Sequence, residues 1–228
     1  MHTRLFAVFF ASATFPAQAL AAPLNEPMTF ASSNGVLDLL MIAQEAPLDG
    51  ISVSGVKGWA YQVCARPKVR DNCPAGTSTP YGGVRLALQP GDTLKVRLVN
   101  RLPLPNPNLP LDRVVDDPLL RLNPTNLHTH GLVVDATPNT VAPPGTPLYG
   151  DFVFTSIFNP SNGDPAAIDF SAYNTLHAHG DVVKNGVADY KIVIPANHPR
   201  GMFWFHPHMH GISVNQISAG MAGIITVG

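Results

Sequence analysis

Seven of the nine histidines in this 228-residue chain gather in three short alternating clusters. The clusters read NLHTHGL at 126–132, TLHAHGD at 175–181 and FWFHPHMHG at 203–211. Neutral imidazole is the commonest metal ligand in proteins, and it suits copper, zinc, nickel and iron. Affinity alone favours Cu(II) among the divalent ions. The clusters therefore raise the question of which of them binds a metal.

Alternate residues of a β-strand project from the same face, so His128 and His130 should point the same way, as should His206 and His208. These four histidines are the candidate metal ligands. Pro207 cannot donate a hydrogen bond to a strand ladder, which places the His-Pro-His run at a sheet edge or on an irregular segment. Glycines follow the first and third clusters, where a missing side chain would let a ligand or another backbone approach.

Other metal sites fit these residues less well. A zinc hydrolase with three histidine ligands would suit a His-x-His strand plus a distant histidine, but no carboxylate is well placed as its general base. A blue-copper site needs a cysteine ligand beside two histidines, and no Cys-His-Met run follows the clusters.

The composition predicts many short strands. Apolar residues make up 45% of the chain, charged residues 13%, and there are 23 prolines and 19 glycines. The net charge of −1 gives no electrostatic footprint for nucleic acid. Frequent turn residues between short apolar runs are typical of an all-β sandwich or barrel with Greek-key connections.

Alternating apolar residues and turn signals locate the expected elements. Residues 101–125 read as a surface loop and about 136–188 as a long loop insertion, with a possible extra hairpin strand at 149–157. A short helix is possible near Ser213–Ala219. The expected strands lie within 50–64, 84–89, 93–100, 126–134, 188–195, 202–206 and 221–227.

The N-terminus resembles a secretory signal. Arg4 precedes an apolar run and a small-residue cleavage region, so residues 1–21 are expected to direct export to the periplasm or the exterior by a Sec-type route. No segment is apolar for long enough to span a membrane. In an oxidising compartment, Cys64 and Cys73 are expected to form a disulfide, the alternative being a pair of thiolate ligands.

The first and third clusters, with SAGMAGIITV at 218–227 and LALQPGDTLKVRLVNRLP at 86–103, resemble the N-terminal plastocyanin-like (cupredoxin) domain of multicopper oxidases, the laccase and copper-efflux oxidase group. The resemblance covers about 84–228 without the insertion. It implies a cupredoxin-like Greek-key β-sandwich or barrel, with 22–228 as a single domain.

The resemblance also implies roles for the four histidines. By position, His128 would bind a type 2 copper, His130 a type 3 copper, and His206 and His208 one type 3 copper each. Such a cluster reduces O₂ with electrons from a reducing substrate, a phenol or a metal ion. The type 1 copper and the other ligands would lie in a C-terminal cupredoxin domain or another subunit, so this chain would hold half of the cluster and be inactive alone.

Alternatives remain beside this reading. The chain could be a stand-alone periplasmic copper-binding or carrier module without catalysis, or an oligomer that completes its copper sites between subunits. The resemblance gives His210 no ligand role, and a place beside the site or at the surface suits it better. His177 and His179 could form an extra metal site or belong to a substrate-side loop, but they are interpreted as plain loop histidines. His198 is interpreted as a solvated turn residue.

Overall fold

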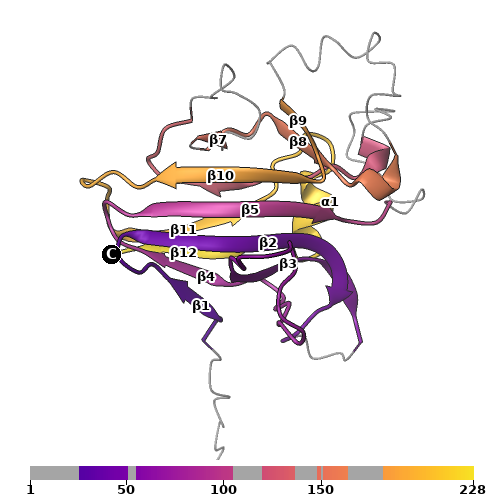
Figure 1. Cartoon of the computed structure of the whole chain (residues 1–228), viewed down its shortest axis with the longest axis horizontal. Coiled ribbons are helices and arrows are strands. Elements are labelled where there is room, and N and C mark those ends of the chain that lie inside the picture. Colours follow the sequence, from indigo (N-terminus) through magenta and orange to yellow (C-terminus); the bar gives the residue numbers. More distant parts are fainter. Residues whose placement is uncertain (1–25, 51–54, 105–119, 137–147, 150, 164–181) are drawn as a thin grey trace, which may run out of the picture.

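Two five-stranded β-sheets packed against each other form the fold in the computed structural model (Figure 1). The structure describes residues 26–50, 55–104, 120–136, 148–149, 151–163 and 182–228. Within these residues no helix is both long and apolar enough to cross a membrane. The prediction of an all-β sandwich is confirmed, and the short helix predicted near Ser213–Ala219 is α1, Ser213–Ser218.

The first sheet carries the two described histidine motifs. Its strand order is β1-β4-β12-β11-β6, with both parallel and antiparallel neighbours. Its strands are β1 (Thr29–Ala31), β4 (Arg85–Leu88), β12 (Gly223–Val227), β11 (Gly201–His206) and β6 (His128–His130).

The second sheet has the order β3-β2-β5-β10-β7. Its strands are β3 (Lys57–Ala65), β2 (Val36–Pro47), β5 (Thr93–Arg101), β10 (Val187–Val193) and β7 (Leu148–Tyr149). A separate parallel pair joins β8 (Thr155–Phe158) to β9 (Val182–Asn185), and two short 3₁₀ turns lie at Leu120–Leu122 and Pro160–Asn162.

The main core lies between the two sheets. As predicted, the alternation in β5 buries one face, because Leu94, Val96 and Leu98 are at most 1% exposed. They pack with Phe205 and Ile225 from the first sheet in one apolar cluster. Burial of apolar area at about 25 cal/mol per Å² is the main force that holds such layers together.

Strand β2 was not predicted, because the first expected strand region was 50–64. Five consecutive residues, Leu39 to Ala43, are buried. A strand that is covered on both faces reads as a continuous apolar run and lacks the alternation used to find strands.

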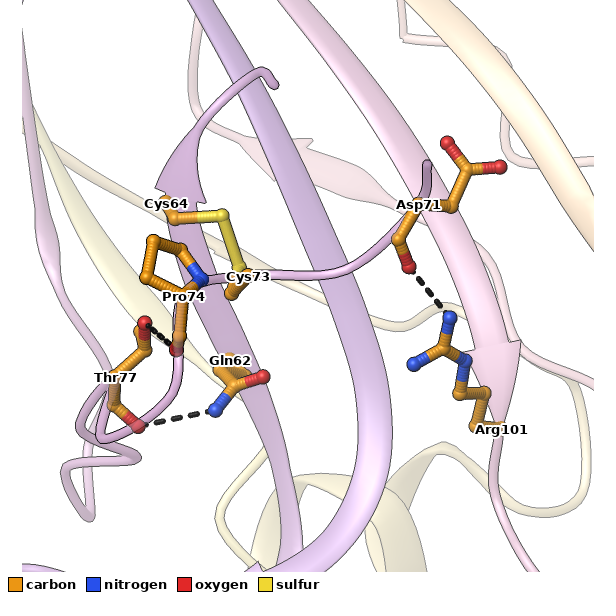
Figure 2. Close-up of a disulfide and its surroundings, with 7 residues drawn as sticks. All are labelled: Gln62, Cys64, Asp71, Cys73, Pro74, Thr77 and Arg101. Carbon is orange, nitrogen blue, oxygen red and sulfur yellow. Dashed lines mark hydrogen bonds between the residues drawn. A yellow bond between two sulfur atoms is a disulfide. The ribbon is translucent and has the colours of Figure 1, made fainter. Parts of the chain in front are cut away.

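A disulfide loop covers the outer face of β2. Cys64 and Cys73 are bonded, as predicted, with Cα atoms 5.8 Å apart. Leu40 and Ile42 form a second small apolar cluster there with Cys64 and its neighbours. Figure 2 shows the loop returning alongside β3, held by hydrogen bonds among Pro74, Thr77 and Gln62 and by Asp71 with Arg101.

A turn at Pro90-Gly91-Asp92 connects the two layers, because the strands that flank it belong to different sheets. The expectation of a surface loop at 101–125 and a loop insertion at about 136–188 was wrong in part. The described parts of 101–125 and 136–188 contain buried residues: Leu102 and Ile157 are fully buried, and β8 joins the core instead of forming a hairpin. Side-chain amides hydrogen-bond to buried backbone carbonyls in these segments. For example, Asn100 Nδ2 donates to the Ile157 carbonyl at 2.7 Å.

An ion-pair network ties the disulfide loop to the second sheet. Arg97 donates two hydrogen bonds to Asp71, at 2.6 and 3.0 Å, and a third to Asp189 at 2.7 Å. The Arg97 hydrogen bonds hold the pKa of the Asp71 carboxyl below its usual range. Burial opposes this shift, and nearby arginine charges add to it. The network is partly exposed, which limits its contribution to stability.

We expect Asp71→Asn to lower the free energy of unfolding at pH 7 by no more than about 1 kcal/mol. A carboxyl whose pKa is lowered in the folded state stabilises the protein above its unfolded value of about 3.9, and this stabilisation is lost as the pH falls through the lower folded value. Urea unfolding at several pH values should show the gap between wild type and variant narrowing below about pH 4. Glu26→Gln, at a residue 85% exposed, is the control. A gap of constant size at all pH values would contradict the assignment.

Candidate metal centre

The first histidine motif forms the edge strand β6 of the first sheet. Thr129 points into the protein and is buried, whereas His128 is half-buried and His130 is exposed on the outer face. The predicted common direction of the two histidines is therefore confirmed. Gly131 follows with φ of 89°, so glycine is required there by the backbone conformation rather than by a ligand.

The second motif is His206-Pro207-His208, from the third histidine cluster of the sequence. It lies beside the first motif because β11 pairs with β6. The antiparallel register sets His206 opposite His128 and Trp204 opposite His130. One ligand nitrogen from each of His128, His130 and His206 lies within 4.8 Å of the others. Three of the four predicted ligands thus converge on one place.

His208 adjoins this group without belonging to the tightest set. Its ring centroid lies 5.0 Å from that of His128 and 6.1 Å from that of His206. It follows the end of β11, and Pro207 interrupts the strand as predicted. All four predicted histidines are therefore neighbours in the structure.

Contacts with the backbone and with Trp204 fix the His206 ring. Its Nδ1 lies 2.8 Å from the Pro207 carbonyl oxygen, which can only accept, so Nδ1 carries the proton and Nε2 is left with a lone pair. Nε2 lies 3.3 Å from His130 Nδ1. The indole of Trp204 stacks on His206 at 4.1 Å and on His130 at 5.0 Å between ring centroids.

Burial favours the neutral form of His206 and His208. Desolvation is the largest cause that lowers the pKa values of His206 and His208, and the neighbouring histidines lower them further. For His206, the hydrogen bond to Pro207 opposes this shift. Neutral imidazole is the form that binds metals.

Asp151 is a polar neighbour of the site that sequence reasoning missed. Its Oδ1 accepts a hydrogen bond from the Thr129 N–H at 2.7 Å, and its Oδ2 lies 2.7 Å from His128 Nδ1. No hydrogen bond is formed at the second contact, but the Asp151 carboxylate is the polar neighbour of His128 Nδ1. No sequence signal marked Asp151, because only the tertiary fold brings it to β6.

Groups from the second sheet anchor the chain just before His128. The Tyr61 hydroxyl donates to the Asn126 carbonyl at 3.0 Å, and the Leu127 N–H donates to the Tyr190 hydroxyl at 3.3 Å. Both tyrosines are buried, and burial raises both of their pKa values, so they remain neutral donors or acceptors. The first motif is thereby held on a rigid base.

The other histidines have different places. The His210 ring lies 5.4 Å from that of His208, as a neighbour of the site. The prediction that His198 is solvated was wrong: it is 5% exposed, accepts a hydrogen bond from the Val133 N–H at 2.9 Å, and contacts the Pro199 carbonyl through its other nitrogen. His177 and His179 lie outside the described residues.

No protein-family model and no curated protein matches the chain. Among solved structures, it is similar to a multi-copper oxidase from Pediococcus acidilactici, with 14% identity and a TM-score of 0.50 over 90% of this chain and 29% of the other. A multicopper oxidase from Campylobacter jejuni, described as a metallo-oxidase, gives 16% identity and a TM-score of 0.49 over 89% of this chain and 28% of the other.

The chain therefore spans less than a third of the length of these two oxidases. At such low identity, the likeness to the Pediococcus structure establishes the fold alone. The chemistry has to be inferred from the residues of the site. The fold of this chain is a cupredoxin-like β-sandwich, as found within a multicopper oxidase.

Proposed function

We propose that this chain is a copper-binding cupredoxin-like domain of the multicopper oxidase type, with His128, His130, His206 and His208 as ligands. The observation that carries the proposal is the convergence of three imidazole nitrogens, from two paired strands, within 4.8 Å. The fold likeness supports the choice of copper.

The residues present fit a metal. Buried polar atoms in folded proteins nearly always have a partner, yet His208 Nδ1 is buried without a hydrogen bond. A metal ion would supply the missing partner to an imidazole nitrogen. The all-nitrogen donor set suits Cu(II), which has the highest affinity among the first-row divalent ions.

The protein would hold its ligands in fixed directions. Paired strands fix the backbones of His128, His130 and His206, while Trp204 and the Pro207 carbonyl orient the His206 ring. Copper bound there would supply one-electron redox chemistry toward O₂. Ligands held by rigid elements limit the rearrangement that a change of oxidation state requires.

Further ligands would complete the site from outside these strands. His130 lies exposed on the outer face of the sheet edge, where another domain or subunit could approach. In this proposal the histidines belong to type 2 and type 3 copper sites, the partner supplies the type 1 copper, and a phenol or metal ion supplies electrons. Secretion or periplasmic export, directed by residues 1–21, belongs to the same proposal.

Removing one histidine from each motif tests the site. We expect His128→Ala with His206→Ala to weaken Cu(II) binding by more than about 100-fold, beyond the roughly 10–100-fold typical of outer-shell changes. Calorimetric titration of the purified chain measures this. His198→Asn is the control, because both of its ring nitrogens are already engaged and it should leave the affinity unchanged.

Unchanged copper affinity in the double variant would overturn the ligand assignment. Oxygen uptake with a phenolic substrate then tests for catalysis. Copper binding without turnover by the chain alone fits either an incomplete oxidase or a copper carrier. Turnover that appears only on addition of a partner domain supports the oxidase. Zinc rather than copper in natively purified protein would contradict both the oxidase and the copper carrier.

Trp204 should report copper binding directly. The chain has two tryptophans, and only Trp204 stacks on candidate ligands. Cu(II) quenches nearby indole fluorescence, so titration should quench the emission of Trp204 while that of Trp59, on β3 of the other sheet, persists. In Trp204→Phe the quenching should disappear, and in Trp59→Phe it should remain. Equal quenching in both variants would place the copper elsewhere.

A further inference from the structure

Asn126 is a fully buried side chain two residues before the first histidine of β6. Its Oδ1 accepts a hydrogen bond from the His208 N–H at 2.6 Å, and its Nδ2 donates to the Val153 carbonyl at 2.7 Å. Its own carbonyl accepts the Tyr61 hydroxyl at 3.0 Å. One residue thus connects the first motif, the second motif, the segment before β8 and the second sheet.

The hydrogen bond between Asn126 and His208 extends the β6–β11 pairing beyond the point where backbone hydrogen bonds end. The β6–β11 register sets His206 opposite His128, and extending it sets His208 opposite Asn126. Pro207 has no N–H, and β11 ends at His206. The side-chain oxygen of Asn126 takes the His208 N–H where the backbone ladder has ended.

This bond fixes a ligand that has no strand to hold it. His208 lies on irregular backbone, yet its ring sits 5.0 Å from that of His128. The second anchor of Asn126, on Val153, keeps its amide from rotating away. A displacement of the His208 backbone by about 1 Å would disturb the distance from its imidazole to a bound copper, because metal–nitrogen distances vary by only about 0.2 Å.

We propose that Asn126 is a positioning residue that holds His208 in register with His128, so that the two motifs contribute ligands to one metal centre. The inference rests on the proposed copper-binding function. It concerns a residue that touches no metal and acts through the backbone of a ligand.

Asn100 offers a matched control. It is also buried, donates from Nδ2 to the Asn123 and Ile157 carbonyls, and accepts at Oδ1 from the Leu102 N–H at 2.9 Å. No hydrogen bond of its side chain reaches a histidine. Replacing either asparagine by leucine removes a buried side-chain amide and its hydrogen bonds. Only Asn126→Leu removes the hydrogen bond to the His208 N–H.

The experiment compares Asn126→Leu, Asn126→Asp and Asn100→Leu in the full chain. Cu(II) affinity is measured by titration, and the number of bound nitrogens by the superhyperfine pattern in electron paramagnetic resonance. Both leucine variants should lose thermal stability. Asn126→Leu should weaken copper binding by about 10- to 100-fold and change the nitrogen pattern, the loss typical of outer-shell partners. Asn100→Leu should leave both unchanged.

Asn126→Asp keeps an acceptor for the His208 N–H but loses the donor to the Val153 carbonyl, so it should lose less copper affinity than Asn126→Leu. A wild-type copper signal in Asn126→Leu would overturn the inference. If Asn126→Leu does not fold, hydrogen exchange of the His208 amide in the wild type decides: protection supports the bond, and exchange at the rate of an exposed loop overturns it. Absence of copper binding in the wild type would instead defeat the proposed function.

Discussion

A pairing of only three residues, between β6 and β11, joins the two histidine motifs, and the candidate site depends on it. Two isolated strands of this length would not stay paired in water. This pair persists because β11 is also bonded to β12 inside the sheet, and because buried groups hold the chain before and beside β6. Tyr61, Tyr190 and Asp151 satisfy backbone groups of 126–129 that would otherwise be buried without partners.

These anchors come from distant parts of the sequence. The two tyrosines lie on β3 and β10 of the second sheet, and Asp151 precedes β8. An unmade hydrogen bond in the interior costs about 1–3 kcal/mol, so each anchor penalises displacement of the motif. The second sheet therefore acts on the site through the core, although it carries no candidate ligand among the described residues.

The second sheet is itself reinforced on its outer face. Strand β2 is buried on both faces because the disulfide loop covers it, and the hydrogen bonds between Arg97 and Asp71 hold that loop down. A cross-link also limits the freedom of the unfolded chain. The site lies on the first sheet, at an edge where His130 remains exposed. A rigid support behind the candidate ligands and an exposed side in front fit the proposal that another domain completes the centre.

The sequence by itself determined the fold class, the disulfide and the residues of the two motifs. Alternation, turn residues and spacing are local properties, and His128 with His130 on one face follows from strand geometry alone. Burial on both faces hid β2, and the loop composition of 101–125 and 136–188 concealed Ile157 and Asp151. The buried Ile157 carbonyl accepts from the Asn100 side chain, and Asp151 reaches β6 by accepting from the Thr129 N–H. Only the tertiary structure decided the register that sets His206 opposite His128, the burial of His198 and the contact of Asn126 with His208, because each results from packing between segments distant in sequence.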